Sequence, residues 1–231
     1  MSAAPRPRPA AGVIARLPLF QHVSRDHLEE IQRAARTLYF RRGESVVRHG
    51  EAAPGLLAVV YGMVKLAMRG PSGAERVLRL VGPSQTFGEV VLFLQQPLPV
   101  DAVAVVDTRI VLVPAEPLLA LVTSDAPFAR NLIASLCQRM HALICDFEAT
   151  TMHGAGERLA AYLESLAEAP GAVRVTLPAP KKLIAARLGM TKETFSRALH
   201  ELAQSGLVSI AGREVVLLDR AGLARAAGME D

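Results

Sequence analysis

Glycine divides the middle of this chain into short segments and then disappears. From Thr37 to about Pro114, turn residues interrupt β-rich runs such as "AVVYGMVKLAMRG" and "ERVLRLV" roughly every 6 to 12 residues. That spacing is typical of an antiparallel barrel or sandwich. From Pro117 to Met152 glycine is absent and apolar residues recur at helical spacing. The chain therefore predicts an α+β fold in which a β-rich domain precedes a long helix. The interrupting glycines are Gly43, Gly50, Gly55, Gly62, Gly70, Gly73, Gly82 and Gly88.

The N-terminal segment and the overall composition indicate a globular protein of the cytoplasm. The chain has 231 residues, 51% of them apolar, which is enough for one or two domains with their own cores. It has no apolar run near the roughly 20 residues that span a bilayer. The opening "MSAAPRPRPAAG" lacks the apolar centre of a signal peptide, so residues 1–12 are expected to be a disordered leader. A helix is expected from Ser24, whose hydroxyl can cap it.

The glycine-free stretch carries an apolar stripe that predicts dimerisation. Its residues stand four, four, three and four apart along a helix expected over residues 126–153, and Ile133 and Ile144 widen the stripe. A helix that buries apolar surface on two sides favours pairing with a second copy of itself. The alternative is that the β-rich domain alone covers both sides. The predicted dimerisation residues are Leu132, Leu136, Met140, Leu143 and Phe147.

The two cysteines, Cys137 and Cys145, lie on the same predicted helix. Eight residues of helix separate their backbones by about 12 Å, so they do not bridge each other. There is no CxxC pair and no cysteine cluster near the N-terminus, which argues against a zinc knuckle or an iron–sulfur site. We interpret both as reduced, structural thiols.

Residues 154–231 have the order of elements of a winged helix-turn-helix. Gly154 and Gly156 provide a bend after the long helix. The segments that follow are a helix around Leu159, a strand "VRVTLP", a short helix "KKLIAARLG", a longer helix "TKETFSRALHELAQSG", and a hairpin from "LVSI" and "EVVLLD".

The longer of these two helices is shaped to enter a groove of DNA. Gly189 suits the left-handed end of the preceding helix, and Thr191 can cap the helix that follows. The apolar side chains of Phe195, Leu199 and Leu202 fall on one face, and the polar side chains fall on the other. On the polar face, Glu193 can accept from cytosine N4 and Arg197 can grip guanine. The alternative is a plain helical hairpin with a solvated face.

A basic flank supports the DNA hypothesis. The net charge of the whole chain is only +4, but Arg174 to Arg197 holds six basic residues and one acid, an excess that suits a polyanion.

The motif "GMTKETFSRALHELAQSGLV" closely resembles the DNA-reading segment of the Crp-Fnr transcription factors. The segments "LYFRRGESVVRHGE", "GMVKL" and "TFGEVVLF" also occur in family order, so the resemblance covers nearly the whole chain. It implies an N-terminal β-roll, a double-stranded β-helix like that of cyclic-nucleotide-binding proteins, over residues 13–125. It further implies a homodimer that recruits or blocks RNA polymerase. Glu193, Ser196 and Arg197 match the E-x-x-S-R pattern of the Fnr-type branch, which binds sites related to TTGAT-N4-ATCAA. The predicted DNA-binding residues are Lys181, Lys182, Thr191, Lys192, Glu193, Ser196, Arg197 and His200.

The same resemblance predicts where an effector would bind. Cyclic-nucleotide members of the family follow F-G-E with an Arg-Ser pair, and this chain has Pro99 and Val100 at that spacing. Where such members offer Thr-Ser on the long helix, this chain has Leu143 and Ile144. A cyclic phosphate would lack its counter-charge, so cyclic AMP is disfavoured, although a cyclic-nucleotide-responsive regulator stays the alternative. The predicted effector pocket comprises Phe87, Gly88, Glu89, Val90, Pro99, Val100, Met140, Leu143 and Ile144.

Haem is a candidate cofactor because the chain also resembles regulators of nitrogen-oxide respiration, some of which are proposed to sense nitric oxide. A haem needs a strong axial ligand, and no histidine carries a spacing signal that marks it as one. The candidates are His22, His27, His49, His141, His153 and His200.

No catalytic or metal-binding pattern emerges. A metal-dependent cupin needs an H-x-H motif with further ligands, and the β-rich region has only His49. Ser-His-Asp, P-loop and paired-carboxylate motifs are absent as well. We therefore expect a regulator rather than an enzyme, with its effector, its target genes and the sign of its output undetermined by sequence.

Overall fold

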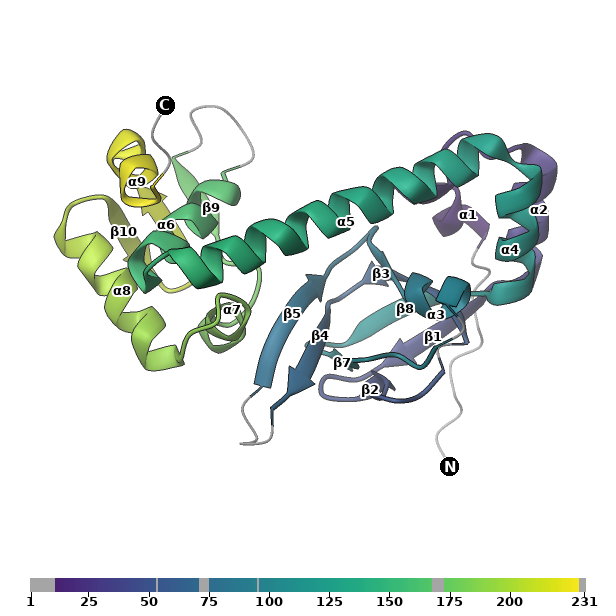
Figure 1. Ribbon diagram of the computed structural model, residues 1–231, viewed down its shortest axis with the longest axis horizontal. Coiled ribbons are helices and arrows are strands. Elements are labelled where there is room, and N and C mark those ends of the chain that lie inside the picture. Colours follow the sequence, from purple (N-terminus) through teal and green to yellow (C-terminus); the bar gives the residue numbers. More distant parts are fainter. Residues whose placement is uncertain (1–10, 53, 71–74, 95, 168–172, 229–231) are drawn as a thin grey trace. The chain divides into compact units, whose positions relative to one another are not determined.

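The computed structural model describes residues 11–52, 54–70, 75–94, 96–167 and 173–228, and within these ranges it leaves the side chains of residues 11, 90, 91 and 149 undescribed (Figure 1). The chain divides into two compact units, Met1–Arg139 and Met140–Asp231. None of the helices in these ranges is long and apolar enough to cross a membrane.

The first unit contains a β-roll of two four-stranded sheets whose strand pairings are all antiparallel. One sheet has the order β1-β8-β3-β6 and the other the order β2-β7-β4-β5. The strands are β1 (Arg36–Phe40), β2 (Ser45–Val47), β3 (Gly55–Tyr61), β4 (Val64–Arg69), β5 (Glu75–Val81), β6 (Thr86–Phe87), β7 (Asp101–Ala104) and β8 (Thr108–Pro114).

The central strand β3 is buried on both faces because it separates two apolar cores. Leu57 and Val59 point into the cluster between the two sheets, together with Ile110 of β8. Leu56 and Ala58 alternate with them and join the cluster beneath the helices. Side chains of a strand alternate between its faces, so a strand with a core on each side becomes apolar throughout.

Helices cover the outer face of the β1-β8-β3-β6 sheet (Figure 1). Ser24 caps α2, because its hydroxyl accepts from the backbone N–H of His27 at 3.4 Å, as the sequence predicts. The short helices are α1 (Ala11–Ile14), η1 (Pro18–Phe20), α2 (Arg25–Ala34), α3 (Glu89–Leu94) and α4 (Ala115–Ser124). Helix α1 begins inside the segment expected to be a leader, and the remainder of that segment, residues 1–10, lies outside the described residues.

The glycine-free stretch forms two helices, and the second begins where the helix of residues 126–153 is expected. It breaks at Asp125, which is extended and ends α4 before α5 (Ala126–Met152) begins. The Asp125 carboxylate accepts from the backbone N–H of Phe128 at 2.9 Å and so caps α5. It also accepts from the N–H of Ser24 at 3.3 Å and lies 3.2 Å from Nδ1 of His27. One carboxylate thus joins the starts of α2 and α5.

The second unit is a winged helix-turn-helix. Its sheet has the order β10-β11-β9, and β10 and β11 form an antiparallel hairpin. The elements are α6 (Ala155–Ser165), β9 (Arg174–Thr176), α7 (Lys181–Arg187), α8 (Lys192–Gln204), β10 (Val208–Ala211), β11 (Glu214–Leu217) and α9 (Arg220–Ala226). The predicted α+β fold class is confirmed. Helix α9, which the sequence reading missed, is capped by Asp219 and packs against α6.

Asp125 yields a prediction for stability. Its pKa is held below the ordinary value of 3.8, chiefly because the backbone N–H of Phe128 donates to the carboxylate. A depressed folded-state pKa stabilises the fold above the unfolded pKa, and the stabilisation is lost as pH falls through the folded value. We expect Asp125→Ala to lower the free energy of unfolding by about 1 to 2 kcal/mol near neutral pH, as for other lost helix caps. Urea unfolding followed by circular dichroism at several pH values measures this difference.

The Asp125→Asn variant is the matched control. Its amide oxygen still accepts from Phe128 but carries no charge, so its stability should not show the acid-dependent loss seen in the wild type. If the difference in the free energy of unfolding between wild type and Asp125→Ala stayed constant down to strong acid, this explanation of the stabilisation would be wrong.

Candidate functional site

A tight turn sets the angle between α7 and α8. Helix α7 ends at Arg187 with Leu188 as its C-terminal cap, and Gly189 then adopts a left-handed conformation with φ of 67°. The N–H of Met190 donates to the carbonyl of Ala185 at 3.0 Å, which closes the end of α7. The hydroxyl of Thr191 accepts from the N–H of Thr194 at 3.1 Å and caps α8. Both local predictions, at Gly189 and Thr191, are confirmed.

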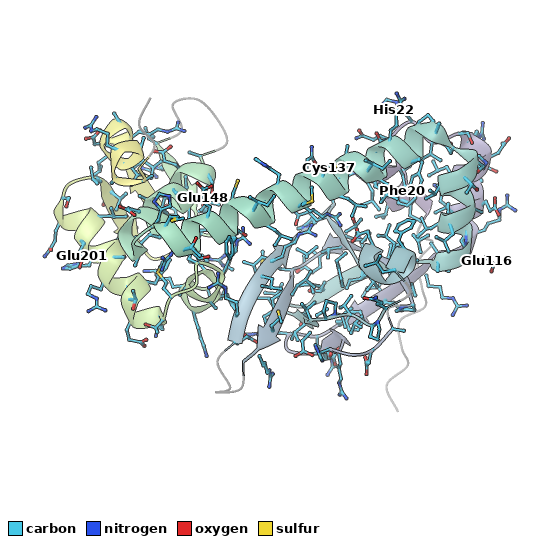
Figure 2. The ribbon with its side chains drawn as sticks, in the orientation of Figure 1. Phe20, His22, Glu116, Cys137, Glu148 and Glu201 are labelled. Carbon is cyan, nitrogen blue, oxygen red and sulfur yellow. The ribbon has the colours of Figure 1, made fainter. Side chains whose placement is uncertain are left out.

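Helix α8 has one buried face and one exposed face. Phe195, Leu199 and Leu202 are 0%, 2% and 7% exposed, so they anchor the helix in the core of the second unit. The side chains predicted to contact DNA from this helix are all exposed, and Thr191 at its cap is exposed too. They are Lys192, Glu193, Ser196, Arg197 and His200. Figure 2 shows the unit with Glu201 of α8 labelled.

The basic flank is smaller than its sequence count suggests. Lys182 at the start of α7 is exposed and Lys181 is half-buried. Arg187, however, forms an ion pair of 3.2 Å with Asp146 on α5. It also lies near Tyr162, whose pKa is raised by burial and lowered in part by this guanidinium. Arg187 therefore braces α7 against the end of α5.

The wing is also tied to the helix-turn-helix by an arginine. Gly212 adopts φ of 65° at the hairpin turn, and Arg213 follows it. The guanidinium of Arg213 donates to the carbonyl of Leu177 at 2.6 Å and 3.1 Å, just before α7. The wing and the start of α7 are thus held together by a side chain that the sequence reading did not single out.

In the first unit, the effector region contains a buried polar triad. Glu89 at the start of α3 is 3% exposed, and its carboxylate pairs with Arg139 of α5 at 2.6 Å. The hydroxyl of Thr86 donates to Glu89 at 2.6 Å and accepts from Arg139 at 2.6 Å. Arg79 donates to the carbonyl of Thr86 at 3.1 Å. The sequence reading named Glu89 but missed Arg139, which follows the buried Leu132 by seven residues and so shares its face of α5.

The other predicted pocket residues are not all brought together. Phe87 and Val100 are buried, Gly88 is buried with φ of 97°, and Pro99 is exposed. The side chain of Val90 lies outside what the structure describes. On α5, Met140, Leu143 and Ile144 are 59%, 56% and 57% exposed. A cavity beside Glu89, lined by Leu92, Phe93 and Leu132 among others, has a volume of about 10 Å³. That is room for about one water molecule.

The predicted dimerisation stripe is divided between two environments. Leu132 is 6% exposed and belongs to the core beneath the helices, and Leu136 packs against that core. Phe147, in contrast, is 70% exposed. The apolar spacing predicted Leu132 as a dimerisation residue. Because α5 packs onto its own unit, however, this side chain has almost no surface left to contact a second copy.

The two cysteines are not bridged, as expected, but both are exposed, so neither packs in a core as a structural thiol would. They are free, and Sγ of Cys145 lies 3.7 Å from Nε2 of His141. The helix presents both thiols to solvent because neither falls on the face that packs against the roll.

The histidines lie at the surface or are engaged by carboxylates. His27 contacts Asp125, and Nδ1 of His153 lies 3.2 Å from Glu157. His22 is exposed, with φ of 70°, at the outer edge of the helices (Figure 2). Among the residues that the structure describes, no three His, Cys, Asp or Glu side chains gather as a metal site.

Comparison with known proteins matches both parts of the chain. The cyclic nucleotide-binding domain matches residues 37–125, and the Crp-like helix-turn-helix domain matches residues 157–226. The chain is similar to the CRP-like cAMP-activated global transcriptional regulator of Mycobacterium tuberculosis, with 29% identity over 223 residues, 93% of this chain and 98% of that protein.

Two further relatives come from Thermus thermophilus. Transcriptional regulator SdrP is 30% identical over 193 residues, which cover 81% of this chain and 92% of that protein. A solved structure described as a CRP/FNR-family transcriptional regulator has a TM-score of 0.65 and 29% identity, covering 83% of this chain and 98% of that one. Fold, domain matches and relatives agree, and the chain belongs to the CRP/FNR family of DNA-binding transcription regulators.

Proposed function

We propose that this regulator acts as a homodimer that reads a two-fold site related to TTGAT-N4-ATCAA. The observation that carries the proposal is the exposed polar face of α8, which projects Glu193, Ser196 and Arg197 opposite its buried face. A helix anchored in this way by a short preceding helix and a capped turn is suited to the major groove. Two such helices in a dimer would meet half-sites about 34 Å apart.

The predicted contact residues divide into base-reading and phosphate-binding groups. Arg197 can donate two hydrogen bonds to guanine O6 and N7, and Glu193 can accept from cytosine N4. Lys181, Lys182 and Lys192 are placed to neutralise phosphates, which fixes register without reading sequence. Thr191 and His200 complete the proposed contact surface.

The proposed division of labour follows the predicted domains. Residues 13–125 would sense the effector, residues 126–153 would dimerise, and residues 154–231 would bind DNA. Helix α5 is held by ion pairs within each unit, Arg139 to Glu89 in the first and Asp146 to Arg187 in the second. An effector that competes for the first pair would change how α5 is held and so shift the population that is competent for DNA. Once bound, the dimer would recruit or block RNA polymerase.

The effector site is proposed within the first unit, around Phe87, Gly88, Glu89 and Pro99–Val100. The domain match and the cAMP-activated relative favour a cyclic nucleotide as the second candidate. Against it, Val100 is 8% exposed and apolar, and Pro99 offers no charge. A phosphate held there would lose its hydration, and the nearby Arg139 already pairs with Glu89.

Haem is a weaker candidate than the sequence alone suggests. His27 and His153 already contact carboxylates, and the cavity beside His27 has a volume of about 50 Å³. Ligand pockets of the size that haem needs are several times larger. We therefore propose no haem ligand, and a Soret band in freshly purified protein would overturn this position and revive nitric oxide sensing.

Arg197→Ala tests the base-reading role. We expect it to cost about 1 to 3 kcal/mol on the specific duplex and to relax discrimination at the guanine that it contacts. Fluorescence anisotropy with the specific duplex and with a duplex changed only at that base pair measures both effects. Arg225→Ala removes the same charge from an exposed position on α9 and should retain discrimination. An equal loss on specific and random duplexes would show that Arg197 contacts only phosphate.

Lys181→Ala and Lys182→Ala test the phosphate contacts. Each should weaken binding to all sequences alike, and the slope of log affinity against log salt should fall by about 1 per lysine, because each lost contact releases fewer counterions. The measurement is a salt titration with specific and random duplexes. An unchanged slope would remove the lysine concerned from the interface.

Calorimetric titration decides between the effector candidates. We expect cyclic AMP and cyclic GMP to show no binding at concentrations of about 100 μM, a ligand level at which a micromolar site would be nearly saturated. Saturable binding of either nucleotide, with a matching change in DNA affinity, would favour the second candidate.

A further inference from the structure

Helix α5 carries a thiol and an imidazole one turn apart. Sγ of Cys145 lies 3.7 Å from Nε2 of His141. Both residues are exposed, and both belong to the second unit. Residues four apart on a helix project from the same side, because one turn takes about 3.6 residues. The same spacing presents the two histidines of the helical H-E-x-x-H motif to zinc. The pair is thus arranged as metal-binding helices arrange their ligands.

The separation of the two ligand atoms suits a tetrahedral ion. Zinc binds a thiolate sulfur at about 2.3 Å and an imidazole nitrogen at about 2.0 to 2.1 Å, so tetrahedral coordination sets the two atoms about 3.5 to 3.6 Å apart. The observed 3.7 Å lies within about 0.2 Å of this separation, and small side-chain rotations are enough to admit the ion. A thiolate with an imidazole is also a donor set that favours zinc over magnesium or calcium.

The pair projects away from the side of α5 that binds α7. Asp146, which pairs with Arg187 of α7, projects about 120° around the helix axis from the midpoint of the pair. The predicted dimerisation residues of this unit project on average about 150° from the same midpoint, so the pair stays open to solvent in the proposed homodimer. These residues are Met140, Leu143 and Phe147.

Glu148 adds a negative charge beside the pair. It is exposed on the next turn of α5, where it is labelled in Figure 2, and it projects within about 60° of both ligands around the helix axis. A carboxylate at this position favours a cation. In the described part of the chain, no third His, Cys, Asp or Glu side chain gathers with the pair. Water or a small solute would therefore fill the remaining positions of a four-coordinate ion.

We propose that His141 and Cys145 form a binding site for a thiol-preferring divalent ion of the zinc type. The ligands are a thiolate and a neutral imidazole, so the thiol of Cys145 gives its proton to solvent as the ion enters. The bound ion then links two successive turns of α5. The site goes beyond the proposed function, because neither the DNA contacts nor the effector region uses these two side chains. The sequence reading tested C-x-x-C and H-x-H patterns, which do not detect the H-x-x-x-C spacing.

Cys137 provides a matched control on the same helix. It is the other of the chain's two cysteines, it is also exposed, and it is labelled in Figure 2. Among the described residues, the imidazole of His141 contacts the thiol of Cys145 and not that of Cys137. Replacing either cysteine therefore separates a paired thiol from an unpaired one without changing the rest of the chain.

The experiment is a titration of the reduced, metal-free, full-length protein with Co²⁺ under argon. Cobalt replaces zinc in such sites, and it gives a thiolate-to-metal charge-transfer band when a cysteine binds it. We expect the band to saturate at one ion per chain in wild type and in Cys137→Ser. Zn²⁺ should abolish the band, because zinc displaces cobalt from sites of this kind.

Two variants test the two ligands. Cys145→Ser should lose the band. His141→Ala should bind Co²⁺ at least about tenfold more weakly, because losing even an outer partner of a metal ligand costs about 10- to 100-fold in affinity. His141→Cys restores a second ligand, so it should recover the affinity and show a stronger band. Circular dichroism of each variant checks that the helical content is unchanged, as expected for exposed side chains.

The outcomes separate a chelating pair from the alternatives. The proposal is overturned by the absence of a thiolate band at about 1 mM Co²⁺, a concentration that would fill even a site of about 100 μM affinity. A band that survives Cys145→Ser, or equal affinities of His141→Ala and wild type, also overturns it, because the ion would then bind at Cys137 or at a single thiol. Saturation at one ion per two chains overturns it as well, since the ion would bridge two copies. A band that requires both side chains, at one ion per chain, supports the proposal.

Discussion

Helix α5 has to satisfy several partners at once, and the rest of the molecule depends on how its faces are assigned. Asp125 fixes where the helix begins, because its carboxylate caps the first turn and holds the N–H of Ser24. Phe128 and Leu132 then bind the helix to the roll through apolar contact. Further along, Asp146 binds it to α7 through Arg187. The large apolar side chains of Met140, Ile144 and Phe147 stay exposed, because neither unit buries them in its own core.

The pair between Glu89 and Arg139 is the polar exception on the roll-facing side. The side chain of Glu89 is 4% exposed and that of Arg139 is 23% exposed, so the pair is largely removed from water. Removing one partner of such a pair is costly because the other charge is left buried and unpaired. The hydroxyl of Thr86 reduces this cost, because it forms a hydrogen bond with each of the two charged groups. A ligand that enters here must therefore replace these contacts with polar groups of its own, which is a chemical constraint on the effector.

Much of the fold could be predicted from local signals in the sequence. The contacts between segments that are distant in the sequence could not. The caps at Ser24 and Thr191 and the buried face of α8 follow from residues a few positions apart, so sequence reasoning recovered them. A helix over residues 126–153 was expected, but apolar periodicity gives no reason for the break at Asp125 that separates it from α4. Its cause is a long-range contact with the start of α2.

The candidate site shows the same division. The exposed face of α8 was predicted residue by residue from a helical wheel, but nothing local indicated that Arg187 is engaged by Asp146, which lies 41 residues earlier. Likewise, Glu89 was identifiable from its motif, but its partner Arg139 lies 50 residues further along the chain. Periodicity alone also placed the buried Leu132 and the exposed Phe147 in one stripe, because only the packing of α5 distinguishes them.

The most direct measurement of the central claim is selection of bound duplexes from a random pool by the purified full-length protein. The account predicts enrichment of an inverted repeat whose half-site centres lie about one helical turn apart, because two symmetry-related α8 helices read it together. Enrichment of a single unpaired half-site, or of no sequence at all, would contradict it.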